Sequence, residues 1–155
     1  DGRLAAVSVQ GREMPISGWS PSTIAGFTAW GPEGVTASEA GLRWALPTGT
    51  LTLAWTPEPL AVFTGAYREA LLAGCACELL DHRTLFVDGK PGAHYRALLA
   101  WKAEPLPSEL VAVPAGEGTL LAAWTGAAPV AEDGLNVPPA DTLYAVLGTL
   151  SWTTP

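Results

Sequence analysis

The chain has 155 residues and a formal net charge of −7, and 48% of its residues are hydrophobic while only 15% are charged. A chain of this length folds as one domain with a substantial core. Its high hydrophobicity excludes a disordered chain, and its apolar runs are too short to span a bilayer. The eight basic residues are scattered along the sequence. This argues against nucleic-acid binding, which depends on basic side chains that neutralise phosphates.

The N-terminal part, residues 1–40, is predicted to be rich in loops. Residues 4–9 read as an opening strand, and Gly, Pro, Ser and Thr are frequent from residue 14 to 40, where one short strand is expected at 24–30. The chain begins at Asp1 rather than Met. We interpret this as a mature exported domain with a lipid anchor upstream, although an artificially trimmed chain would begin in the same way.

The middle of the chain predicts a hairpin followed by a helix. Residues 42–46 and 51–55 alternate between apolar and polar side chains on either side of a Pro-Thr-Gly turn, which is typical of a β-hairpin. From residue 60 to 73 the apolar period becomes helical, with Pro59 suited to the first turn and Gly74 to the C-terminal cap.

The second half predicts two further hairpins and a last helix. The hairpin strands are expected at residues 77–87 and 94–103, joined by an Asp-Gly turn, and at 110–113 and 119–124. After a loop over 125–137, a helix opens at 138–141 and ends at Gly148, before a return to the sheet at 150–152. Helices grouped among hairpins indicate a single α+β domain over residues 1–155, with a central antiparallel sheet flanked by helices. An all-β barrel or sandwich is the alternative if both helices are absent.

Four residues form the candidate metal site: Cys75, Cys77, His82 and His94. Thiolates and imidazoles suit zinc or copper, and residues two apart on a strand point to the same side. The Cys-Ala-Cys spacing is tighter than structural zinc sites use, and a disulfide across it would be strained. Buried thiols, a disulfide and a metal site therefore all remain open, with buried thiols favoured.

A catalytic role is not favoured by any motif. His82 and His94 are candidates for an acid or base, since imidazole as a group titrates near neutrality, but a lone His beside a turn is usually a solvated surface residue. The sequence contains no nucleophile elbow, phosphate-binding glycine loop or metalloprotease helix. We therefore expect a protein that is not an enzyme and binds no cofactor.

Seven tryptophans are many for this length. They suit either core packing at strand ends or a groove for a sugar or an aromatic ligand, and core packing is the favoured interpretation. The seven are Trp19, Trp30, Trp44, Trp55, Trp101, Trp124 and Trp152.

Three segments between Gly41 and Trp152 resemble the PsbP/Mog1-like group, which includes DcrB-type bacterial envelope lipoproteins. They are the helix at residues 60–73, the hairpin Leu-Phe-Val-Asp-Gly-Lys-Pro-Gly-Ala-His-Tyr at 85–95, and the closing helix and strand at 141–152. The resemblance implies an antiparallel sheet between helices and an adaptor, accessory or envelope role. It carries no catalytic residue onto this sequence.

Together these features predict a non-catalytic, exported accessory or binding domain of the cell envelope. We expect a periplasmic or extracellular location, with a cytoplasmic one as the alternative, and another protein as partner. Two rival functions remain: a small-molecule or glycan binder that uses exposed tryptophans, and a metal-binding protein built on the Cys75, Cys77, His82 and His94 cluster.

Overall fold

The structure is a computed structural model that describes residues 6–9, 12–15, 18–24, 26–38, 41–47, 49–73, 78–87, 90–99, 106–126 and 141–152. The strands are β1 (Ala6–Val9), β2 (Arg12–Pro15), β3 (Ser20–Ile24), β4 (Phe27–Gly31), β5 (Val35–Ser38), β6 (Gly41–Leu46), β7 (Gly49–Thr56), β8 (Glu78–Val87), β9 (Lys90–Leu99), β10 (Leu106–Ala115), β11 (Gly118–Gly126) and β12 (Ser151–Trp152). The helices are α1 (Leu60–Ala73) and α2 (Asp141–Gly148).

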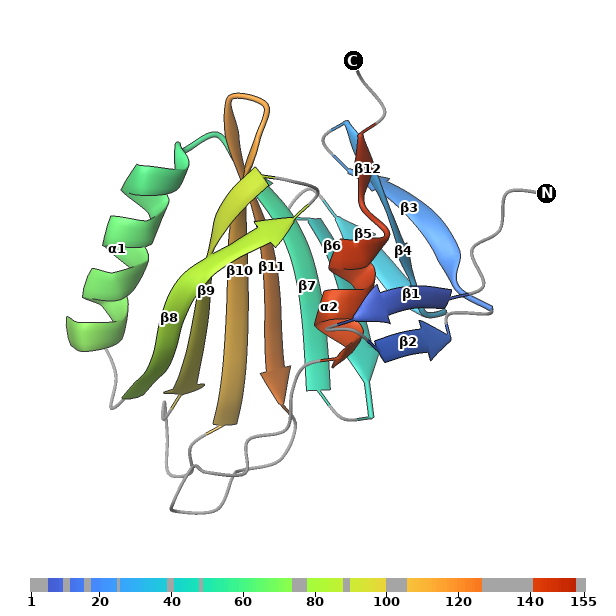
Figure 1. Cartoon of the computed structure of the whole chain (residues 1–155), viewed down its shortest axis with the longest axis horizontal. Helices are drawn as coiled ribbons and strands as arrows, with labels where there is room; N and C mark the ends of the chain where they lie inside the picture. Colours follow the sequence, from blue (N-terminus) through green and yellow to red (C-terminus); the bar gives the residue numbers. More distant parts are fainter. Residues whose placement is uncertain are drawn as a thin grey trace.

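A large antiparallel sheet organises the molecule (Figure 1). Its seven strands run in the order β5-β6-β7-β11-β10-β9-β8. Strands β8 to β11 form consecutive hairpins, while β7 pairs with β11 rather than with β8. The segment between β7 and β8, which contains α1, therefore crosses the sheet and places the helix over the half formed by β8 to β11.

The two sides of this sheet have different neighbours. Side chains alternate along a strand, and paired residues of adjacent strands point the same way. Leu53, Val111 and Leu120 point to one side, here called the α2 face, because α2 and a small sheet pack there. Tyr95 and Leu110 are paired and point to the other side, here called the α1 face.

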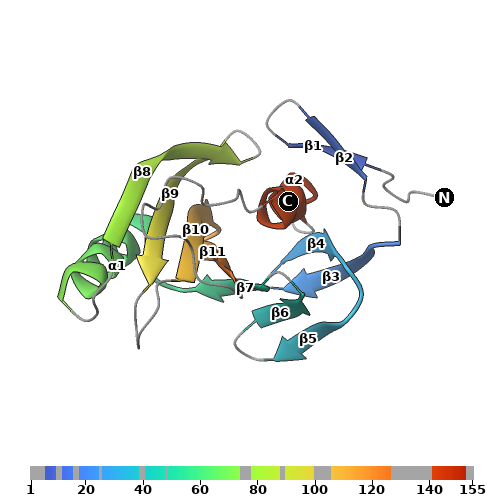
Figure 2. The same ribbon diagram turned by 90° about the horizontal axis from the view of Figure 1, so that it is seen from below.

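The main core lies on the α2 face. The small sheet β12-β4-β3 contributes Phe27 and Ala29 to it, and α2 contributes Leu143, Val146 and Leu147, all buried. Figure 2 shows α2 beside β3 and β4. These apolar side chains of α2 recur at helical spacing, so their burial explains why this short segment is a helix.

Two buried tryptophans pack against glycines within this core. Trp44 lies where a side chain of Gly31 would stand, and its indole N–H donates to the carbonyl of Pro32 at 3.0 Å. Trp124 occupies the same position relative to Gly49. An indole laid over a glycine fills the gap left by the missing side chain and buries a large apolar surface. The favoured interpretation of the tryptophans as packing residues is correct for these two.

Both predicted helices are present, so the α+β prediction is confirmed and the all-β alternative is wrong. The prediction that residues 14–40 are mainly loop is also wrong, because β3, β4 and β5 lie there. Short strands with frequent Gly, Pro and Ser resemble loops, and the tertiary pairing that defines them is not visible locally. Strand β9 begins earlier than expected. It includes Pro91, which is paired with Phe86 of β8 and so extends the hairpin.

Candidate binding site

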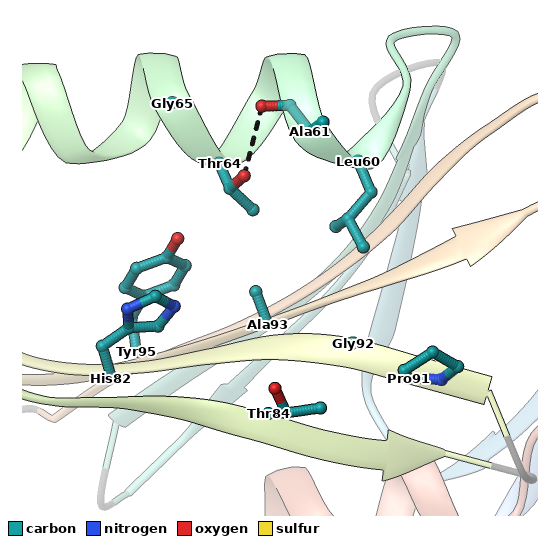
Figure 3. Close-up of a pocket in the computed structure, with 10 residues that line it drawn as sticks. All are labelled: Leu60, Ala61, Thr64, Gly65, His82, Thr84, Pro91, Gly92, Ala93 and Tyr95. Atoms are coloured by element: carbon teal, nitrogen blue, oxygen red, sulfur yellow. Dashed lines mark hydrogen bonds between the residues drawn. The ribbon is translucent and has the colours of Figure 1, made fainter.

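A cleft of about 460 Å³ lies between α1 and the outer strands of the large sheet, on the α1 face. This volume falls in the range of small-molecule sites. Figure 3 shows the helix along one wall, the strands along the other, and two rings closing one end. The lining residues are Leu60, Ala61, Thr64 and Gly65 of α1, His82 and Thr84 of β8, and Pro91, Gly92, Ala93 and Tyr95 of β9.

Small residues occupy part of both walls of the cleft. Ala61 and Gly65 line the helical wall, and Ala93 lies on the sheet wall beside the backbone of Gly92. Gly65 is in the interior of α1, where glycine costs about 0.5–1 kcal/mol relative to alanine. A Cβ at this position would meet nothing within 4 Å, so neither close packing nor backbone conformation requires the glycine. Its main effect is to leave the cleft open.

Aromatic rings form one end of the cleft. The His82 ring is stacked on Tyr95, with centroids 4.4 Å apart and planes 6° from parallel. Tyr67 of α1 meets the same tyrosine at 5.0 Å and 58°. Burial raises the pKa of Tyr67, and the neighbouring Tyr95 raises it further. Both neighbours hold the Tyr95 ring in place.

Tyr95 itself is the most unusual lining residue. It is only 1% exposed, and its hydroxyl is directed toward α1 and the cleft (Figure 3). Among the residues that the structure describes, none forms a hydrogen bond with this hydroxyl; its contacts there are the two ring contacts. The hydroxyl is therefore available to a ligand that enters the cleft.

The other face of the same strands carries a polar cluster with a buried centre, here called the His94 cluster and formed by Arg83, His94, Arg96, Glu109 and Tyr144. His94 is 1% exposed and Glu109 3% exposed. The Arg83 Nε donates to His94 Nδ1 at 3.2 Å, so the imidazole proton is on Nε2, which lies 2.9 Å from Glu109 Oε1. The Tyr144 hydroxyl of α2 donates to the same oxygen at 2.5 Å, and Arg96 Nε lies 3.7 Å from it.

The geometry of the His94 cluster suits structure better than catalysis. Both nitrogens of His94 are engaged, so the ring is not free to accept a proton from a substrate. The pKa of Tyr144 is raised by burial and by its hydrogen bond to Glu109, so the phenol stays protonated. Because Tyr144 comes from α2 and Glu109 from β10, the cluster holds α2 against the large sheet.

The predicted metal ligands do not come together in the described part of the chain. His82 points to the α1 face and is exposed, as expected for a solvated histidine, whereas His94 points to the α2 face. The expectation that His94 is a surface residue is wrong, because α2 covers it. Cys75 and Cys77 lie outside the described residues. Within those residues, no group of three His, Cys, Asp or Glu side chains could hold a metal ion.

Exposed tryptophans do not form a cluster in the residues whose burial is described. Trp55 is 37% exposed, and its indole N–H is engaged by the carbonyl of Ala115 at 3.0 Å. Trp19 and Trp30 are partly buried. Trp101 lies outside the described residues, as does the side chain of Trp152. The cleft under α1 contains none of these tryptophans.

Sequence reasoning missed Tyr95, Glu109 and Tyr144. For Glu109 a signal exists, because this charged residue stands between Pro107-Ser108 and the apolar run Leu-Val-Ala-Val. A carboxylate within a buried strand needs partners. No comparable signal identifies Tyr95, because a tyrosine in a strand is ordinary core material.

No protein-family model and no curated protein matches the sequence. Solved structures do match its fold. Cyanobacterial PsbP (CyanoP) from Synechocystis sp. PCC 6803 aligns with a TM-score of 0.53 at 13% identity, over 88% of this chain and 94% of that chain. A protein of unknown function from Pseudomonas aeruginosa, PA94, aligns with a TM-score of 0.53 at 10% identity, over 70% of this chain and 82% of that chain. The chain therefore has a fold similar to that of PsbP, and the finer DcrB-type resemblance stays a prediction.

Proposed function

We propose that this chain is a non-catalytic accessory domain that binds a ligand in the cleft under α1. The observation that carries the proposal is the open cleft, kept free by Gly65 and lined by Tyr95, whose hydroxyl is directed into it. Gly65 lowers stability through its poor helix propensity. Features that cost stability are often kept because they serve function.

The absence of catalysis is part of the same proposal. Within the described residues, His94, Glu109 and Tyr144 are of the types that enzymes use as acids and bases. These three side chains form hydrogen bonds with one another. The cleft contains His82, without a nucleophile hydrogen-bonded to it among the described residues. An accessory role also agrees with what the PsbP/Mog1-like resemblance implies.

A fragment screen by ¹H–¹⁵N NMR tests the binding site. The wild-type protein is compared with Gly65→Leu, which fills the cleft, and with Ala66→Leu, which adds the same bulk to an exposed position of α1 outside it. We expect fragments that shift the amide signals of His82, Thr84 and Ala93 in the wild type and in Ala66→Leu. The same fragments should leave these signals unchanged in Gly65→Leu.

Two results would contradict the proposal. One is that no fragment shifts the signals of the cleft residues. The other is that fragments bind Gly65→Leu as well as the wild type, which would place their site elsewhere.

We further propose that the domain works in the cell envelope, as the resemblance to envelope lipoproteins implies, and that its partner there is another protein. No helix in the described part of the chain is long and apolar enough to span a membrane. Fractionation of cells that express the natural gene with a C-terminal tag tests the location. Recovery of the tag in the cytoplasmic fraction alone would contradict it.

A further inference from the structure

We infer that the ligand of the cleft is a small, uncharged, planar ring compound that carries a hydrogen-bond acceptor. This inference rests on the proposed function, since it names the chemical class of ligand for the same cleft. Three features of the lining support it: the aromatic end of the cleft, the absence of full charges, and the position of one hydroxyl.

The aromatic end of the cleft favours a flat ligand. Leu60 and Thr64 project from the helical wall and Thr84 and Tyr95 project from the strands, so the walls themselves do not set the shape of the ligand (Figure 3). The stacked ring of His82 closes one end and is exposed, so a flat ligand finds an aromatic edge there.

The charges of the lining favour an uncharged ligand. Among the ten described residues that line the cleft, none is Asp, Glu, Lys or Arg. An ionised ligand would lose hydration on entry without gaining an opposite charge, and burying an uncompensated charge is costly. An anion would also be repelled by the net charge of −7.

The hydroxyl of Tyr95 favours an acceptor on that ligand. The ring of Tyr95 is buried, its hydroxyl is directed into the cleft, and no described residue bonds the hydroxyl. A phenolic O–H donates readily to a carbonyl oxygen or to a ring nitrogen. A ligand with such an atom satisfies the hydroxyl, whereas a hydrocarbon of the same shape leaves it without a partner.

Four probes of similar size test the three features separately. Benzamide is flat, uncharged and carries a carbonyl; benzoate adds a charge; cyclohexanecarboxamide is not flat; toluene lacks the acceptor. Titration of the wild-type protein, followed by ¹H–¹⁵N NMR shifts of the cleft residues, should give the tightest binding for benzamide. Equal or tighter binding of any of the other three would overturn the corresponding part of the inference.

Tyr95→Phe tests the acceptor directly, with Tyr144→Phe as the matched control on the other face of the sheet. We expect Tyr95→Phe to weaken benzamide binding about 3- to 10-fold, the effect of one neutral hydrogen bond, and to leave toluene binding unchanged. Tyr144→Phe should change neither. If benzamide binds wild type and Tyr95→Phe equally but is lost in Gly65→Leu, the cleft is the site and the inferred acceptor is wrong. If Gly65→Leu also binds benzamide, the proposed function itself fails.

Discussion

The polar groups of the large sheet have different surroundings on its two faces. On the α2 face, His94 and Glu109 are as deeply buried as the apolar core, and their hydrogen bonds are made by Arg83 and by Tyr144. On the α1 face, Tyr95 is equally buried, but no described residue bonds its hydroxyl, and the cleft beside it is open. His94 and Tyr95 are consecutive residues of β9, so their side chains point to opposite faces of the sheet.

Burial alone therefore does not identify a functional site. A deeply buried charge whose partners come from within the protein is a structural feature, since its desolvation is offset where it stands. A polar group that lacks such a partner and faces an opening is better explained by a ligand.

Glu109→Ala should have the largest effect. It leaves the Nε2–H of His94 and the hydroxyl of Tyr144 buried without their acceptor, so we expect the free energy of unfolding to fall by about 3–5 kcal/mol. Urea unfolding followed by tryptophan fluorescence measures it. Glu117→Ala, which removes the same charge from an exposed turn, should change stability by less than about 0.5 kcal/mol. Similar losses in the two variants would show that the cluster does not stabilise the fold.

High pH should destabilise the protein partly through Tyr144. Its pKa in the folded state is raised by burial and by Glu109, above the value of about 10 in the unfolded chain. Below pH 10 both states keep the proton, and above it only the folded state does. The free energy of unfolding should therefore fall by up to about 1.4 kcal/mol per pH unit for this group.

Urea unfolding of the wild type and of Tyr144→Phe between pH 8 and about 11 checks this expectation. The variant should lose stability less steeply above pH 10. Tyr67, whose pKa is also raised, adds a slope of the same sign in both proteins. Identical pH profiles would show that Tyr144 titrates normally.

Gly65→Leu should have the smallest effect and the opposite sign. Leucine is a better helix former than glycine, and a side chain there enters open space. We expect the free energy of unfolding to rise by about 0.5–1 kcal/mol. Ala66→Leu is the control and should be close to neutral. A loss of stability in Gly65→Leu would mean that the α1 face is packed closely and holds no open cleft.

The fold was largely predictable from local patterns. The helices at residues 60–73 and 141–148 follow from a change in apolar period and from Gly and Pro at their ends. The short strand expected at 24–30 corresponds to β4, whereas β3 and β5 were missed because they lie in a segment rich in Gly, Pro and Ser. What defines these three strands is the contact of Trp44 with Gly31 and other tertiary neighbours, which no local window contains.

The candidate site was not predictable in the same way. The pairing of His82 with Tyr95, and of Arg83 with His94, depends on the register of β8 against β9. A shift of one residue would send each side chain to the other face. Sequence reasoning grouped His82 and His94 as ligands of one metal, whereas the register places them on opposite sides of the sheet.

Tyr95 and Tyr144, on opposite faces of the large sheet, allow a direct test of whether one face is structural and the other binds a ligand. The free energy of unfolding is measured by urea denaturation for Tyr95→Phe and Tyr144→Phe, which remove the same atom from equivalent rings. Tyr144→Phe should lower it by about 1.5–3 kcal/mol, since a hydrogen bond to a charged group is lost, while Tyr95→Phe should cause no loss. Equal losses in the two variants, or a larger loss in Tyr95→Phe, would contradict the division of the sheet into a structural face and a binding face.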